Sequence, residues 1–172
     1  MEQKIHFGAS KPEFTVEPAA KRSAANLALR LLSQRSHTRL ELNLKLKRRG
    51  VDRKIIDSVV AECERLDYLN DEAFARTYRK QMTEKGYGAR YVQMAMNQKG
   101  FTDRDIETAF SDYDRVADEK IAAQIALVRK SKTLEYLPDN LKKKQKLYRF
   151  LCSRGFSPST VFEVLNALFA RT

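Results

Sequence analysis

Side chains that carry catalytic or metal chemistry are few in this sequence and are not spaced to act together. The cysteines and histidines of the 172-residue chain lie far from one another: Cys63, Cys152, His6 and His37. None of them forms the close pairs that are typical of a metal site. Carboxylate pairs such as Asp103 and Asp105 are expected at helix N-termini, where they offset the helix dipole, and not in an acid–base site. We therefore predict no metal, no cofactor and no enzymatic activity.

The side chains that could bind a partner are basic. Lysine and arginine number 33 against 22 aspartate and glutamate, which gives a net charge of +11. Two dense runs of cations, residues 45–49 and 142–149, lie in the outer thirds of the chain. Such runs favour a polyanionic partner, although each could instead be a charged helix face that only maintains solubility. Tyr87, Tyr91 and Tyr148 lie near cations in the sequence and could stack on unpaired bases, or pack half-buried at helix starts.

A repeated glycine indicates the elements that position these side chains. Gly50, Gly100 and Gly155 each follow a lysine or arginine, and a helix-capping residue stands two positions later. Apolar residues recur at helical spacing on both sides of each glycine: Leu42, Leu46, Ile56, Val60, Val92, Met96, Ile106, Phe110, Leu147, Leu151, Val161 and Leu165. This pattern predicts an amphipathic helix, a glycine turn and a second amphipathic helix in each repeat.

A further helix is expected before each pair. The three stretches are residues 23–33, 71–85 and 114–132. We therefore predict an all-α chain of three tandem three-helix repeats behind a loosely ordered tail. The boundaries are 1–22 for the tail and 23–69, 70–113 and 114–172 for the repeats. Because a repeat of this size scarcely supports an isolated core, neighbouring repeats should pack together in an elongated, curved, solenoid-like body.

Membrane attachment is not expected from this sequence. No stretch is apolar enough for a membrane-spanning helix, and the first 20 residues hold no apolar block of the signal-peptide kind. We expect a cytoplasmic protein that is monomeric in solution and has no membrane partner.

Two alternative interpretations of the repeat remain open at this point. A helix, a glycine turn and a second helix also resemble the helix-turn-helix of DNA-binding regulators. Those proteins usually have a small residue four positions before the glycine, whereas this chain has Leu46, Met96 and Leu151 there. The other alternative is a basic helical repeat that binds nucleic acid without any protein partner.

Each repeat also carries runs of residues that match a known family. The runs are 28–33 and 36–42 in the first repeat, 68–75, 85–90 and 97–101 in the second, and 148–156 in the third. They resemble the RecX regulatory proteins of bacteria, and the resemblance extends from about Ala24 to Ala170. Its most specific part is Lys85-Gly86-Tyr87-Gly88-Ala89-Arg90, in which Ala89 stands where the family commonly has proline. Nothing before Ser23 matches the family.

The resemblance implies a function that composition and spacing could not name. RecX proteins bind the RecA recombinase filament on single-stranded DNA along its groove and suppress its ATP hydrolysis and strand exchange, which affects recombination, DNA repair and the SOS response. They are modulators and not enzymes. On this basis we expect contacts to the filament, and weak electrostatic contacts to single-stranded DNA, from these residues: Arg48, Arg49, Lys85, Tyr87, Arg90, Lys99, Lys142, Lys143, Lys144, Lys146, Arg149 and Arg154.

Overall fold

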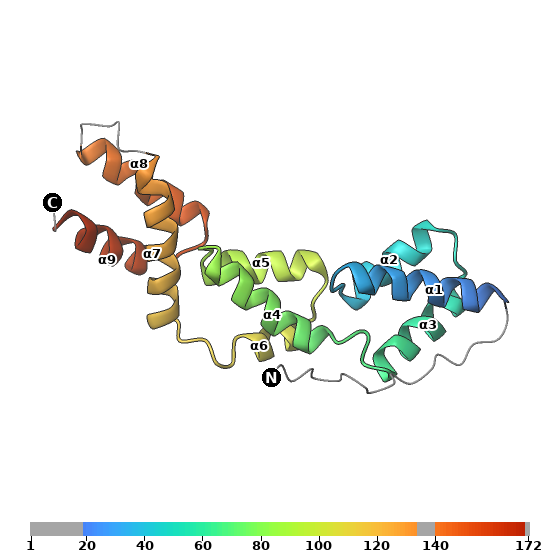
Figure 1. Ribbon diagram of the computed structural model, residues 1–172. Coiled ribbons are helices and arrows are strands. Elements are labelled where there is room, and N and C mark those ends of the chain that lie inside the picture. The colour runs from blue at the N-terminus through green and yellow to red at the C-terminus, as the bar shows by residue number, and fades with distance from the viewer. Residues whose placement is uncertain (1–18, 134–139, 171–172) are drawn as a thin grey trace, which may run out of the picture. The chain divides into compact units, whose positions relative to one another are not determined.

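The structure is a computed structural model that describes residues 19–133 and 140–170. Within those residues it consists of nine helices and no strand, which confirms the predicted all-α chain. The helices divide into two compact units, one ending at Asn70 and the other beginning at Asp71. The first unit holds one three-helix repeat and the second holds two (Figure 1).

The first unit packs three helices around one apolar core. The helices are α1 (Ala19–Gln34), α2 (Arg39–Arg48) and α3 (Arg53–Arg65). Leu42 and Leu46 on α2 are fully buried in a cluster with Val59 and Val60 of α3. Removing side chains of this size from water contributes roughly 1.5–3 kcal/mol each. This packing therefore explains why the apolar positions before and after Gly50 lie on facing sides of two helices.

The first helix begins earlier than the sequence pattern predicted. We expected a loosely ordered tail over residues 1–22, yet α1 already includes residues 19–22. Alanine, lysine and arginine, the residue types at these positions, are strong helix formers, so the helix extends back past Ser23. The rest of the predicted tail, residues 1–18, lies outside the described residues.

The second unit contains six helices in two repeats. They are α4 (Asp71–Glu84), α5 (Ala89–Lys99), α6 (Asp103–Ala109), α7 (Ala117–Lys132), α8 (Asn140–Ser153) and α9 (Pro158–Phe169). Val92, Met96 and Phe101 centre the core of the second repeat. Leu147 and Leu151 centre that of the third, in which α7, α8 and α9 form one bundle (Figure 1). Eleven of the twelve predicted apolar positions are buried, and Phe110 is half-buried.

The predicted turns and caps are confirmed in all three repeats. Gly50, Gly100 and Gly155 have positive φ angles of 77°, 90° and 81°, a conformation that costs glycine little because it has no Cβ. Thr102 then caps α6 in a capping box with Asp105, whose carboxylate accepts from the Thr102 amide. Asp52 and Ser157 cap α3 and α9 in the same place, and Pro158 occupies the first turn of α9.

The start of α7 differs from the prediction. We expected the helix to begin near Asp114, whereas it begins at Ala117. The Asp114 carboxylate accepts hydrogen bonds from the amides of Val116 and Ala117, at 2.8 and 3.1 Å. These bonds lower the pKa of Asp114 below its usual value. Asp114 therefore lies in front of the helix, where its carboxylate satisfies two amides at the helix start, instead of forming the first turn.

The second and third repeats meet at a junction of glycines. A Cβ at Gly88 would lie 2.5 Å from the carbonyl oxygen of Gly155, and a Cβ at Gly86 would lie 3.0 Å from the Cβ of Ala126. The amide of Gly88 also donates a hydrogen bond to the carbonyl oxygen of Arg154 at 2.9 Å. The most specific sequence run of the chain therefore allows the backbones of two repeats to approach closely.

Candidate nucleic-acid and partner interface

Helix α8 presents the densest group of cations in the described residues of the second unit. Leu147 and Leu151 face the core of the third repeat. Over Asn140–Ser153 the helix carries five basic residues and no acidic one: Lys142, Lys143, Lys144, Lys146 and Arg149. Three of these side chains are exposed and two, Lys143 and Lys144, are half-buried. A helix of this kind is suited to a polyanion, because no carboxylate on it offsets the positive charge.

A groove of about 340 Å³ runs between α8 and α9 beside these cations. Its lining is Leu141, Lys144, Gln145, Tyr148, Arg149, Phe162 and Leu165. Three of these apolar side chains are open to solvent, with exposed fractions of 66% for Leu141, 61% for Phe162 and 41% for Tyr148. Lys144 donates a hydrogen bond to Asn166 Oδ1 at 3.0 Å, and its Nζ lies 6.0 Å from the centre of the Phe162 ring. The groove thus combines exposed aromatic rings with cations.

The basic run of the first unit divides into inward and outward side chains. Arg48 and Arg49 are exposed and line a small groove of about 160 Å³ together with Leu27 and Leu31. Lys45 lines the same groove, but its Nζ lies 2.7 Å from His37 Nε2. This run therefore offers fewer outward cations than its sequence suggests.

His37 is a buried structural residue that is held by local hydrogen bonds. Its Nδ1 lies 2.9 Å from the carbonyl oxygen of Arg35 and must donate to it, which leaves Nε2 to accept from Lys45. Burial, with smaller contributions from Arg35 and Lys45, lowers the pKa of His37 below its usual value. The imidazole is therefore held neutral between two neighbouring cations.

Two predicted interface residues of α5 have different surroundings. Arg90 is exposed and lines a groove of about 460 Å³ between the second and third repeats. Lys99 is half-buried, and its ammonium group lies 5.7 Å from the centre of the Phe74 ring and 5.5 Å from that of Tyr78. Lys99 thus stabilises the aromatic core of its own repeat, whereas Arg90 is accessible to a partner.

Lys85, Tyr87 and Arg154 lie at the junction between the two repeats. The Arg154 guanidinium group stacks on Tyr87, 4.5 Å from the ring centre, and donates to the carbonyl oxygens of Lys85 and Gly86 at 3.1 and 3.2 Å. Tyr87 also stacks on Tyr91, with ring centres 4.5 Å apart. These contacts position the repeats, and they lie apart from the groove between α8 and α9.

Sequence reasoning missed a buried carboxylate beside the Arg90 groove. Glu119 of α7 is 7% exposed and accepts hydrogen bonds from the Ser157 amide at 3.2 Å and from the Ser157 and Thr160 hydroxyls at 2.9 Å each. It therefore caps the N-terminus of α9 from a neighbouring helix. Nothing in the sequence separates Glu119 from an exposed glutamate, since its partners lie about 40 residues away.

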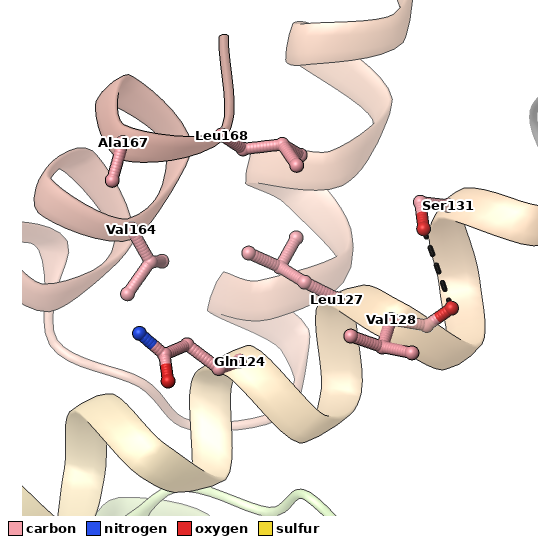
Figure 2. Close-up of a pocket in the computed structure, with 7 residues that line it drawn as sticks. All are labelled: Gln124, Leu127, Val128, Ser131, Val164, Ala167 and Leu168. Atoms are coloured by element: carbon pink, nitrogen blue, oxygen red, sulfur yellow. Dashed lines mark hydrogen bonds between the residues drawn. The ribbon is translucent and has the colours of Figure 1, made fainter. Parts of the chain in front are cut away.

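A second groove of the third repeat is apolar. It measures about 330 Å³ and lies between α7 and α9, lined by Gln124, Leu127, Val128, Ser131, Val164, Ala167 and Leu168 (Figure 2). Ser131 Oγ donates to the carbonyl oxygen of Val128 at 3.3 Å, so this hydroxyl bonds its own helix. Because no cation or aromatic ring lines it, this groove is a poor match for nucleic acid.

The metal-ligating and thiol side chains of the described residues are dispersed. No group of three or more histidine, cysteine, aspartate or glutamate side chains there could hold a metal ion. Cys63 is buried, and burial raises its pKa to about 11, which disfavours the reactive thiolate. Cys152 is half-buried. Among the helices of residues 19–133 and 140–170, none has the length and apolar character to span a membrane.

Family comparisons cover all three repeats. The models of the first, second and third three-helix domains of RecX match residues 24–63, 70–109 and 118–165. Regulatory protein RecX of Chlorobaculum tepidum is 35% identical over 152 residues, which is 88% of this chain and 91% of that protein. Its counterpart in Mycobacterium sp. is 31% identical over 166 residues, covering 94% and 90%.

Solved structures share the fold at lower identity. The crystal structure of RecX from Lactobacillus salivarius matches with a TM-score of 0.69 at 23% identity, over 88% of this chain and 97% of that one. A second crystal structure of a regulatory protein RecX matches with a TM-score of 0.74 at 20% identity, over 86% and 73%. Matches to all three domains, with relatives above 30% identity over most of their length, show that the chain belongs to the RecX family of regulatory proteins.

Proposed function

We propose that this chain modulates the RecA recombinase filament. It binds the filament formed on single-stranded DNA, lies along the filament groove, and lowers ATP hydrolysis and strand exchange, and through them recombination, DNA repair and the SOS response. The observation that carries the proposal is membership of the RecX family over nearly the whole chain. No cofactor is required, because the mechanism is binding and not chemistry.

The arrangement of cations supports a partner with many negative charges. Helix α8 has five basic residues without an acidic one, and Arg48 and Arg49 are exposed in the first unit. Contacts of this kind are individually weak and decrease with salt. Several repeats that bind one assembled filament gain affinity together, since after the first contact the others become intramolecular. Binding to a filament should therefore be much tighter than binding to one recombinase subunit.

Modulation follows if the bound chain fits one filament state better than another. A ligand shifts an equilibrium only by its difference in affinity for the two states. A chain that contacts neighbouring subunits can favour a geometry that turns over ATP slowly. The effect would then extend beyond the subunits that are touched directly.

A binding experiment separates this function from plain nucleic-acid binding. The affinity of the chain would be measured for RecA filaments on single-stranded DNA, for the same bare DNA, and for RecA without DNA. The proposal expects the filament to bind at least tenfold more tightly than either component, since it offers both sets of contacts. Equal affinity for filament and bare DNA would favour the basic repeat without a recombinase partner.

Two exposed arginines of the second unit supply a test variant and its matched control for this experiment. Arg90→Ala should weaken filament binding, because Arg90 is exposed beside the junction of the second and third repeats. Arg104→Ala removes the same charge from an exposed position on α6 of the same unit and should have little effect. If both variants lose affinity equally, the loss reflects overall charge, and Arg90 makes no specific contact.

A further inference from the structure

The groove between α8 and α9 combines three properties that no other described groove shares. Tyr148 and Phe162 expose aromatic surface on it, the buried Leu165 contributes to its lining, and Lys144 and Arg149 line it with cations. The groove between α7 and α9 lacks both aromatic rings and cations (Figure 2). The Arg90 groove includes carboxylates, and the first-unit groove has no aromatic ring. The α8–α9 groove is therefore the one that suits a flat, apolar group attached to an anion.

Two other tyrosines that could stack on bases are already engaged. Tyr87 and Tyr91 stack on each other at an interplanar angle of 17°, and the Arg154 guanidinium lies over Tyr87. Tyr148 has no such ring partner among the aromatic pairs of the described residues. Tyr148 is therefore the best placed of the three to accept a stacking ligand.

Charge on α8 indicates what that ligand is attached to. The helix has no acidic residue, so a negatively charged chain that follows it meets no carboxylate on that helix. Lys144 is held by Asn166 at 3.0 Å, which fixes one cation beside the Phe162 ring. A hydrogen bond with the Cys152 thiol raises the pKa of Tyr148 above its usual value. An acidic protein segment would also be attracted, but exposed aromatic rings among cations are more typical of sites for single strands.

We propose that this groove binds an unpaired base of single-stranded DNA. The base stacks against the exposed surface of Tyr148 and Phe162, and the adjoining phosphates are bound by Arg149 and the lysines of α8. This inference rests on the proposed function, because it assigns the DNA contact of that function to one site. It also goes beyond electrostatic attraction, since it requires bases and not phosphates alone.

The test crosses a change in the protein with a change in the DNA. The protein variant is Tyr148→Leu with Phe162→Leu, which keeps apolar volume at two exposed positions but removes both rings. The DNA is a labelled oligothymidylate, or a strand of the same length with abasic sites, and binding is followed by fluorescence anisotropy without recombinase. Val128→Ala, at an exposed position in the apolar α7–α9 groove, is the control. Circular dichroism checks that each variant is folded.

The proposal predicts a non-additive result. The double variant should bind the normal strand about tenfold more weakly than the wild type does, with the same salt dependence, because stacking is lost and phosphate contacts are kept. The wild type should lose a similar factor on the abasic strand, and the double variant should lose little more there. The Val128→Ala control should match the wild type on both strands.

Three outcomes would overturn the base site. They are unchanged binding of the normal strand by the double variant, an equal loss on normal and abasic strands, and a loss accompanied by a weaker salt dependence. If the double variant binds DNA normally but no longer binds RecA filaments, the groove binds protein, and the base site is wrong while the proposed function stands. Because the DNA assay contains no recombinase, its result does not depend on that function.

Discussion

Individual cations of this chain have different roles once their surroundings are compared. Lys45 faces the buried His37, Lys99 lies over two aromatic rings, and Arg154 connects two repeats through backbone carbonyls. Arg48 and Arg90, in contrast, are exposed. The sequence predicts all of these as equivalent cations, because it does not show which side chains find partners far along the chain. Contacts with DNA should therefore come from cations outside these three structural roles.

The lysines of α8 should govern the salt dependence of DNA binding. Replacing Lys142, Lys143 and Lys146 with glutamine leaves Lys144 in place to hold Asn166. Each phosphate contact that is lost should reduce the slope of log affinity against log salt by about 0.7, so three contacts should reduce it by about 2. Affinity for single-stranded DNA at low salt should fall as well. Titrations of labelled DNA at several salt concentrations measure both quantities.

A charge-matched control separates local contacts from net charge. Lys54→Gln, Lys80→Gln and Arg104→Gln remove three exposed positive charges outside α8. This variant should keep a slope close to that of the wild type. If it reduces the slope as much as the α8 variant does, the α8 run is only part of a diffuse positive surface.

His37 should make the first unit less stable in acid. Its pKa is lowered in the folded protein, so the unfolded chain binds the proton more readily. Stability from the neutral imidazole is therefore present above the unfolded value of 6.5 and is lost as the pH falls through the folded pKa. Thermal melting at about pH 7.5 and about pH 5.5 should show a larger decrease for the wild type than for His37→Gln. Equal decreases would mean that other groups account for the acid effect.

At the scale of the helices, local signals predicted most of the fold. Glycine turns, capping residues and apolar spacing placed the helices on both sides of Gly50, Gly100 and Gly155, and these are confirmed. The groove between α8 and α9 was not predictable in the same way. Helix α9 is apolar on several sides, so its sequence does not show that Phe162 is exposed while Val161 is buried. That distinction depends on where α7 and α8 pack.

The glycine junction should be sensitive to one added methyl group. Gly88→Ala places a Cβ 2.5 Å from the backbone oxygen of Gly155, and backbone cannot rotate away as a side chain can. Overpacking of this kind typically costs about 1–3 kcal/mol, so the free energy of unfolding of the second unit should fall by that amount. Denaturant titration followed by circular dichroism measures the change.

A second alanine substitution tests the cause of that loss. The Cβ added by Gly50→Ala would have no atom within 4 Å, but Gly50 has a φ of +77°. It should cost about 1 kcal/mol from backbone strain alone and should affect the first unit. If Gly88→Ala is tolerated without loss, the close approach of the second and third repeats does not constrain that position.

At the scale of the whole molecule, the elongated and curved body expected from the sequence stays a prediction. Each repeat is too small to form an independent large core and should contact mainly its neighbours. A compact protein of this length has a radius of gyration of about 16 Å. X-ray scattering in solution should give a clearly larger value, together with a mainly helical far-ultraviolet spectrum. A value near that of a compact sphere would reject the extended arrangement while leaving the helical repeats intact.

The protein is proposed to act on the assembled RecA filament, beyond its binding to DNA alone. The direct measurement is ATP hydrolysis by preformed RecA filaments on single-stranded DNA, titrated with this protein. If one bound molecule contacts several subunits, as proposed, inhibition should occur at far fewer copies than there are RecA subunits. A protein that only competes for DNA would need enough copies to cover the strand, and preformed filaments would resist it. If preformed filaments keep their full ATPase activity at every ratio, the proposed function is wrong.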